Sequence, residues 1–433
     1  MRSRRGTRAD PESVEPSQEV RAVGPVVRSA LRAQAAAGLS QAFGAAQLGL
    51  LLVLIGPDRS TDAYLVLIAL GQVPVQILAM GVLYPQCLAG TEPKSWVRVL
   101  ALCGGSAAGA VLLGAAYLRH AGYQEPGLWF TAVLLAGGCA ALSAATCQAV
   151  RLASQGAPVA LAGVAVPGNL AAVCGLVVAA GSRSDRPVTV TVMCGALFGG
   201  SLLSLLMVTR RLSRPQNNPG ATSGPAGAWV GTGRLFGAST AVAVTGVLVQ
   251  GVLARLPAGQ VTEFGVAARI AGFAVTVGVN AALPVLVNKD RFSERAVRTG
   301  ACVAAWGLPL AVALAAVTVR LVHAPGSLPS GALVAITAFV PALALHSIAV
   351  QSVMKEGRSR VLVWASAATL TATGAVLVPA AVAGSTVGVA LAVLMGTCAA
   401  AAVLCQAMRW RRELLGVAVG VVLCVGVSVV LPA

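Results

Sequence analysis

Charged side chains are scarce in this sequence of 433 residues, at only 10% of the total. A soluble domain carries about 25% charged residues, because its surface must face water. Aromatic residues are also few, at 4%, whereas hydrophobic residues reach 57% and the mean hydropathy is +0.82. The scarcity of charge excludes a water-soluble globular protein and indicates a protein embedded in a membrane.

Sequence signatures of catalysis and of metal binding are absent as well. The chain has no HExxH, GxSxG or phosphate-binding loop in a suitable context, and no polar domain that could hold paired catalytic carboxylates. Its ten cysteines form no CxxC pair and lie within or beside apolar runs, where cysteine behaves as a small hydrophobic residue. We therefore predict no enzyme, cofactor, metal site or disulfide. The cysteines are Cys87, Cys103, Cys139, Cys147, Cys174, Cys194, Cys302, Cys398, Cys405 and Cys424.

Apolar runs that are long enough to cross a bilayer recur along the chain. A crossing needs roughly 20 residues and takes the form of a helix or a closed barrel. The runs are continuous and rich in Ala, Leu, Val and Gly, which favours helices over the alternating strands of a barrel. We predict an all-α integral membrane protein whose spans are 33–55, 63–89, 97–118, 127–150, 157–180, 187–208, 232–254, 261–287, 296–319, 330–353, 361–382, 386–408 and 414–431.

The spans group as six, six and one. A stretch rich in Pro, Gly and Asn at 210–228 separates the sixth span from the seventh and is typical of a flexible linker. We predict two six-helix lobes with an alternating-access transporter fold, and one extra transmembrane helix at the C-terminus. The predicted parts are a disordered basic cytoplasmic arm at 1–32, a first lobe at 33–208, a cytoplasmic linker at 209–231, a second lobe at 232–408 and the extra helix at 409–433.

Lysine and arginine are distributed unequally between alternate loops. If the N-terminus is cytoplasmic, most of the 31 basic residues fall on the cytoplasmic side, where positive charge is retained. The net charge of +17 is then an orientation signal rather than a surface for nucleic acid. We predict a multi-pass protein of a bacterial-type plasma membrane with its N-terminus in the cytoplasm. The outer loops hold only Arg59, Arg119, Arg183, Arg186, Arg255 and Arg320.

Two segments about 200 residues apart resemble each other. TDAYLVLIALGQVPVQILAMGVLYP at 61–85 and TEFGVAARIAGFAVTVGVNAALP at 262–284 both begin with Thr and an acid and end in proline. Each half has an even number of spans, so repeated halves would share one orientation. This predicts two lobes related by an axis along the membrane normal, and the alternative is a chance likeness between two apolar helices.

The same segments resemble the MviN/MurJ-type lipid II flippases, a family within the multidrug, oligosaccharidyl-lipid and polysaccharide exporter superfamily. GPDRSTDAYLVLIALGQVPVQILAMG at 56–81 is similar to the family's opening Gly, short loop and Asp-Ala-Phe pattern. LPAGQVTEFGVAARIAGFAVTVGVNAALPVL at 256–286 is similar to its PaG…ADR…lG…lP stretch, and QSVMKEGRSRVLV at 351–363 to its Arg-Gly-Asp-x-x-x-Pro loop. The resemblance implies two lobes that rock about a central cavity and move a polyprenyl-diphosphate-linked glycan between leaflets. It implies lipid-linked glycan, membrane lipids and enzymes of envelope biosynthesis as partners.

The resemblance also assigns residues. The acid that opens the family's second helix matches Asp62, and the arginine of its eighth helix matches Arg269. Two arginines of its first helix fall on Gln41 and Gln47, so most of the family's cationic cavity is replaced here. Because an arginine fork matches phosphate oxygens, Arg269 is implied as a substrate contact.

Each charged candidate has a structural alternative. Asp62 and Glu263 occupy equivalent points of the repeat near helix N-termini, where a carboxylate can cap the helix or serve in gating or coupling. Arg269 lies inside a span, where it can contact substrate or extend to the membrane surface.

The neutral candidates are the amides Gln41, Gln47 and Asn280. They can line a cavity as substrate contacts or bond neighbouring helices to each other. Asn169 is a further intramembrane amide with the same two interpretations.

Two other functions stay open on the sequence. The loss of cavity arginines favours a drug or metabolite exporter of the same superfamily. The sparse intramembrane charge favours a degenerate membrane scaffold for envelope biosynthesis.

Overall fold

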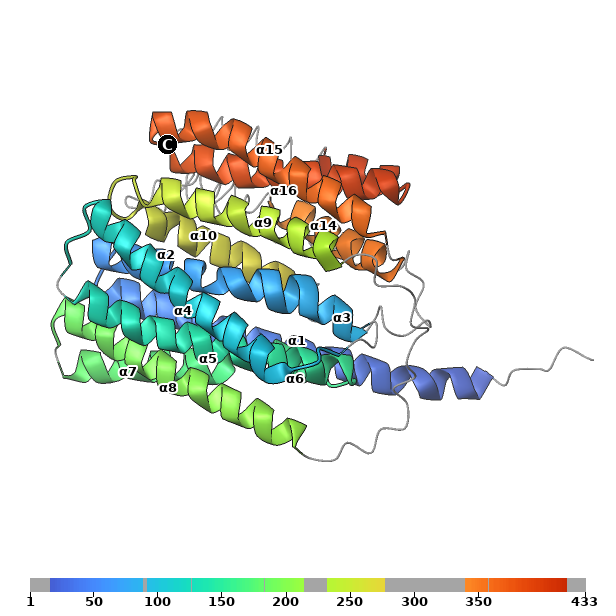
Figure 1. Cartoon of the computed structure of the whole chain (residues 1–433), viewed down its shortest axis with the longest axis horizontal. Helices are drawn as coiled ribbons and strands as arrows, with labels where there is room; N and C mark the ends of the chain where they lie inside the picture. The colour runs from blue at the N-terminus through green and yellow to red at the C-terminus, as the bar shows by residue number, and fades with distance from the viewer. Residues whose placement is uncertain are drawn as a thin grey trace, which may run out of the picture.

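The computed structural model of the chain describes residues 16–88, 92–125, 127–182, 184–213, 232–276, 339–356 and 358–418. Within these ranges all regular structure is helical, and the helices run side by side along the long axis of the molecule (Figure 1). The described residues contain nine helical stretches that are long and apolar enough to cross a membrane, two of which join consecutive elements, Arg59–Cys87 and Pro158–Gly181. The prediction of an all-α, multi-span membrane protein is therefore confirmed.

The first half of the chain forms the predicted spans with shifted ends. The residues 16–32, which the sequence assigned to a disordered arm, are helical, and this corrects the prediction for that stretch. Proline at the start of a helix is favoured because its missing N–H needs no partner there. The elements are α1 (Pro16–Leu54), α2 (Arg59–Pro74), the π-helical segment η1 (Val75–Leu83), α3 (Tyr84–Leu88), α4 (Trp96–His120), α5 (Leu128–Ser154), α6 (Pro158–Ala162), α7 (Val166–Gly181) and α8 (Arg186–Leu212).

The second half is described in part. The predicted span 296–319, the ends of its two neighbours, the linker from residue 214 and most of the predicted last helix lie outside the described residues. The two-lobe arrangement and the extra C-terminal helix therefore stay predictions. The described elements are α9 (Thr232–Leu253), α10 (Gln260–Val275), α14 (Phe339–Lys355), α15 (Ser359–Ala383) and α16 (Thr386–Ala407).

The helices α2 and α10 share their local form. Each has 16 residues, and the residue that follows each helix, Val75 or Thr276, is π-helical. Pro74 explains the π-helical form at Val75, because proline cannot donate to the helical ladder and its ring crowds the preceding turn. The two helices thus share their length and the form of the next residue, about 200 residues apart, while the internal repeat itself stays a prediction.

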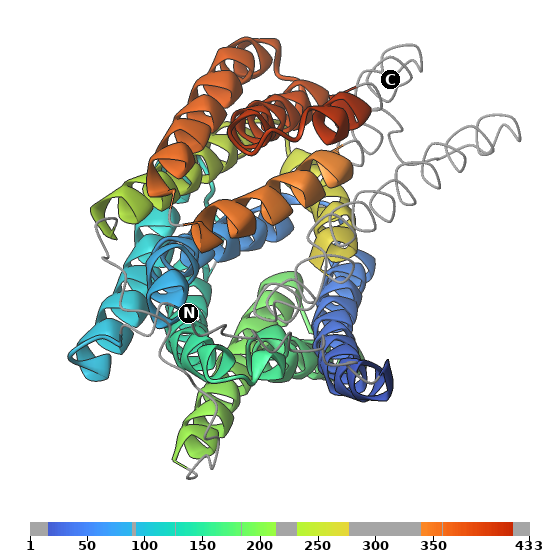
Figure 2. The same ribbon diagram turned by 90° about the vertical axis from the view of Figure 1, so that its right-hand side faces the viewer.

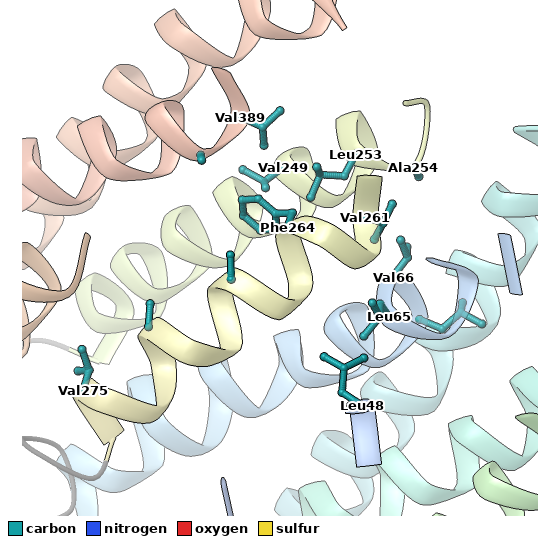
Figure 3. Packing of buried hydrophobic residues seen from close by; sticks show 14 of the residues in the cluster. Leu48, Leu65, Val66, Val249, Leu253, Ala254, Val261, Phe264, Val275 and Val389 are labelled. Carbon is teal, nitrogen blue, oxygen red and sulfur yellow. The ribbon is translucent and has the colours of Figure 1, made fainter. Parts of the chain in front are cut away.

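One hydrophobic core runs through both halves of the chain. Its members include Leu48 of α1, Leu65 of α2, Phe264 of α10 and Val389 of α16. In Figure 3, α10 lies between α1 and α2 on one side and α9 and α16 on the other. In the view along the bundle, α10 lies beside α1 (Figure 2). Because α10 touches helices of both halves, it is well placed to couple them.

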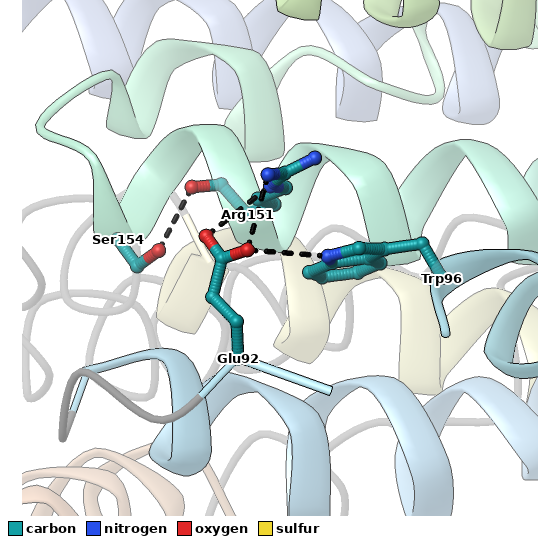
Figure 4. A network of polar contacts seen from close by, with 4 residues as sticks. All are labelled: Glu92, Trp96, Arg151 and Ser154. Atoms are coloured by element: carbon teal, nitrogen blue, oxygen red, sulfur yellow. Dashed lines mark hydrogen bonds and ion pairs between the residues drawn. The ribbon is translucent and has the colours of Figure 1, made fainter. Parts of the chain in front are cut away.

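The loop before α4 is held on the end of α5 by a small polar network (Figure 4). Arg151 Nη2 donates to Glu92 Oε2 at 3.0 Å, Trp96 Nε1 donates to the same oxygen at 3.3 Å, and the guanidinium lies 5.1 Å from the centre of the Trp96 ring. Both charged side chains are partly exposed, so the pair contributes at most about 1 kcal/mol. It fixes the loop rather than holding the bundle together.

The backbones of α7 and α8 approach each other closely at Gly200, and this predicts a large effect for one substitution. A Cβ at Gly200 would lie 2.4 Å from the Pro167 carbonyl oxygen and 2.8 Å from Ala171 Cβ. Gly200→Val should therefore separate the helices and destabilise the fold by about 3 kcal/mol or more. Gly199→Val is the matched control, because a Cβ there would meet nothing within 4 Å. Thermal unfolding of both variants in detergent would test this, and equal midpoints would contradict it.

Candidate functional site

Asp62 joins the two halves of the chain at one end of the bundle. Its side chain is fully buried. Oδ2 accepts a hydrogen bond from the Gly259 N–H at 2.8 Å, and Oδ1 accepts from the Thr262 N–H at 2.9 Å and from Thr262 Oγ1 at 2.6 Å. One carboxylate of α2 thus binds three donors at the start of α10, an arrangement we call the Asp62 contact.

The Asp62 contact supplies a cap that α10 lacks. The first N–H groups of a helix have no partner within the helix, and an N-cap side chain normally accepts from them. Asp58 does this for α2 by accepting from the N–H groups of Ser60 and Thr61. The equivalent N-cap of α10 is Gly259, which has no side chain and a φ of 92°. Asp62 provides the missing acceptor, so the capping interpretation holds, but for a helix of the other half.

Tyrosines of the first half add further bonds at this end. Tyr123 Oη donates to the Ala254 carbonyl oxygen at 3.2 Å, and Tyr117 Oη donates to the Gly251 carbonyl oxygen at 3.0 Å. Tyr123 lies in the loop after α4, and burial raises the pKa of its phenol to about 12. The phenol therefore stays protonated, as a donor must. The end of the bundle formed by residues 55–62 and 254–262, which we call the Asp62 end, is closed by these bonds.

Arg269 reaches across from α10 to α1. Its Nη1 donates to the Gly44 carbonyl oxygen at 2.7 Å, and its side chain is partly buried. Gly44 precedes the last residue of α1 by ten positions, and Arg269 follows the first residue of α10 by nine, so both lie about 14–15 Å into the bundle. A hydrocarbon core is about 30 Å thick. The guanidinium therefore lies deep in the bundle, near half that thickness, and is not extended to the surface.

A second polar side chain approaches α1 at the same level. Asn169 Nδ2 of α7 donates to the Ser40 carbonyl oxygen at 3.0 Å. A Cβ at Gly44 would lie 3.5 Å from both Asn169 Nδ2 and Arg269 Nη1. The two donors therefore meet over the bare backbone of Gly44. Because glycine has no side chain, it leaves this surface of α1 open to them.

Gln47, one turn along α1, is engaged in the first half alone. Its Nε2 donates to Tyr64 Oη at 2.5 Å and contacts Met193 Sδ at 3.5 Å, and both Gln47 and Tyr64 are fully buried. This supports the helix-bonding interpretation of Gln47 in this structure. The sequence offered no signal for Tyr64 as its partner.

The structure brings some of the predicted site residues together and leaves others apart. Arg269 of α10 contacts α1 at Gly44, one turn from Gln47, and Asp62 lies at the Asp62 end. Gln41 is half-buried on α1 and forms no hydrogen bond with a described residue. Asn280 lies outside the described residues, and so does the side chain of Glu263. Roles in substrate binding and gating therefore stay predictions for all of them.

The sequence matches no family model and no curated protein. Solved structures do match over most of the chain. The lipid II flippase MurJ in an inward closed conformation has a TM-score of 0.60 at 12% identity, with 91% of each chain covered. A mutant of the Vibrio cholerae MATE transporter VcmN has a TM-score of 0.57 at 15% identity, with 92% of this chain and 99% of that chain covered.

A transporter of the multidrug, oligosaccharidyl-lipid and polysaccharide exporter (MOP) superfamily, from Pyrococcus furiosus, is also similar. It has a TM-score of 0.59 at 13% identity, with 89% of this chain and 95% of that chain covered. The chain has the fold of MOP superfamily transporters. At these identities the likeness concerns the fold alone. The flippase and the MATE transporter match the MOP fold of this chain almost equally well, so the likeness leaves the substrate undecided.

Proposed function

We propose that this chain is a flippase-like transporter that moves a polyprenyl-diphosphate-linked glycan, a cell-envelope precursor similar to lipid II, across the plasma membrane by alternating access. A diphosphate-sugar head cannot cross hydrocarbon unaided, so it needs a shielded path with a cation in it. The observation that carries the proposal is the deep position of Arg269.

The described residues leave Arg269 with unused capacity to bind an anion. With the described residues it makes a single hydrogen bond, to the Gly44 carbonyl oxygen, although a guanidinium has five N–H donors. A phosphate can accept two parallel bonds from such a fork. A charge at this depth is costly unless it has a partner, and intramembrane arginines commonly mark a substrate path.

The position of Asp62 argues against a site for a cationic drug. Among the nine candidate spans, Asp62 is the only acidic residue. Its carboxylate already accepts three hydrogen bonds in the Asp62 contact. Within those nine spans the anionic group that a cationic drug would need is therefore occupied, whereas the described residues leave most N–H donors of the Arg269 guanidinium unused.

Alternating access assigns the Asp62 contact a gating role. We propose that the N-terminus is cytoplasmic, that the Asp62 end faces outward, and that two lobes separate there to release substrate. Opening would break the three bonds of the Asp62 contact, so the closed state is favoured until substrate binding offsets their loss. Glu263, on the first turn of α10, is proposed to take part in the same step.

Reconstituted protein would test the proposal directly. Vesicles would carry a polyprenyl-diphosphate glycan with a fluorescent label on its head group, and a membrane-impermeant reductant would quench label in the outer leaflet. We expect the purified chain to make most of the label accessible, whereas protein-free vesicles should lose only the outer half. Transport of a cationic dye without glycan transfer would favour a drug exporter, and transport of neither would favour a scaffold.

A further inference from the structure

A groove of about 770 Å³ lies on the side of the bundle, near the Asp62 end. Helices α2 and α4 form one wall, and α9 and α15 form the other. Its lining is largely aliphatic, with Leu70, Leu113, Val247, Leu248 and Val382 among the lining residues. Several of these side chains are exposed, so the groove opens sideways, where a membrane protein meets lipid.

The groove ends in a fixed cation. Arg255 follows α9 and lines the groove, and its Nε donates to Tyr117 Oη at 3.2 Å. Tyr117 Oη in turn donates to the Gly251 carbonyl oxygen at 3.0 Å. The phenol holds the guanidinium by one nitrogen, and the two terminal nitrogens form no hydrogen bond with a described residue.

The chemistry of the groove fits one class of ligand. Arg255 is the charged residue among the described lining residues, and none of them is acidic. Along α9, the lining runs from Val247 to Arg255, a distance of about 12 Å. An apolar trough at membrane depth that ends in an exposed cation is complementary to an acyl chain joined to a phosphate.

We propose that this groove binds an anionic glycerophospholipid, with an acyl chain against α4 and α9 and the phosphate on the terminal nitrogens of Arg255. The walls come from both halves of the chain, so a bound lipid would contact both at once. Such a lipid would stabilise the closed Asp62 end, because a ligand favours the arrangement to which it binds better. The proposal is independent of what the chain transports.

Lipid binding to the full chain in detergent would test the proposal, with native mass spectrometry of added phosphatidylglycerol or phosphatidylcholine as the measurement. Arg255→Gln should weaken phosphatidylglycerol about fivefold and leave phosphatidylcholine unchanged, since one cation near the membrane surface contributes about that factor. Leu248→Trp should fill the trough and weaken both lipids. Arg119→Gln is the matched control, because Arg119 is exposed near the same end of α4 and does not line the groove.

Three outcomes would overturn the proposal. Equal losses in Arg255→Gln and Arg119→Gln would indicate general attraction by surface charge. Unchanged binding in both Arg255→Gln and Leu248→Trp would place the lipid elsewhere. Tight binding of a polyprenyl phosphate to the wild-type chain, without binding of phosphatidylglycerol, would assign the groove to an isoprenoid tail instead. A variant that fails to fold would show no thermal unfolding transition. If Leu248→Trp fails in this way, Leu248→Ala would replace it as a milder change to the wall of the groove.

Discussion

Arg269→Ala is expected to reduce transport of a lipid-linked glycan at least tenfold and to leave folded protein in the membrane. The substitution removes the deep guanidinium that the proposed function assigns to the diphosphate, and a hydrogen bond to a charged group is worth about 1.5–3 kcal/mol. The bundle should persist, because the described residues offer only one bond to this side chain, at the Gly44 carbonyl oxygen. The vesicle assay with labelled glycan measures the loss.

Two further variants give this prediction its controls. Arg269→Lys should retain part of the activity, because the charge persists while the fork that binds two phosphate oxygens is lost. Arg98→Ala removes an exposed arginine at the start of α4 and should transport normally. Wild-type transport by Arg269→Ala at matched expression would contradict the role of Arg269. The exporter and the scaffold would then be the better interpretations.

Asp62→Ala should be the most destabilising of the single substitutions at the interface between the halves, by about 3 kcal/mol or more. The change leaves the Gly259 N–H, the Thr262 N–H and the Thr262 hydroxyl without their acceptor, and each buried donor without a partner costs about 1–3 kcal/mol. The midpoint of thermal unfolding in detergent measures the effect. Asp62→Asn should fall between wild type and Ala, because the amide keeps one acceptor oxygen.

Asp185 provides the matched control for Asp62. It is also an aspartate beside a helix N-terminus, preceding α8, but its side chain makes no capping hydrogen bond and the residue is exposed. Asp185→Ala should therefore change stability by less than about 0.5 kcal/mol. Equal unfolding midpoints for Asp62→Ala and Asp185→Ala would show that the Asp62 contact does not hold the halves together.

The sequence was a good guide to the helices and a poor guide to their partners. Hydropathy alone located the nine spans that the described residues contain, because a helix in lipid must be apolar along its length whatever it packs against. The break in the span at 157–180 and the π turn after Pro74 depend on proline geometry and shift only the ends and the local form. Residues 16–32 look too polar to pack, yet polar residues are compatible with a helix that continues from a membrane span.

Site residues were harder to predict, because their partners are mostly backbone atoms. Every residue has a carbonyl oxygen, so no pattern marks Gly44 as the acceptor for Arg269. A carboxylate near a helix N-terminus suggested capping for Asp62, but its own helix is already capped by Asp58. The informative residue is Gly259, the N-cap of α10, because a capping side chain is expected at that position and glycine has none. Only the folded chain shows which acid fills that place.

The Asp62 contact also has a consequence for the order in which the chain is made. Asp62 and Gly259 are 197 residues apart, and synthesis at about 5–20 residues per second separates their emergence from the ribosome by roughly 10–40 s. During that interval the carboxylate must be satisfied by water or by a temporary partner. When α10 emerges, its first turn is completed by a side chain inserted long before. The Asp62 contact can therefore form only after the start of the second half has emerged.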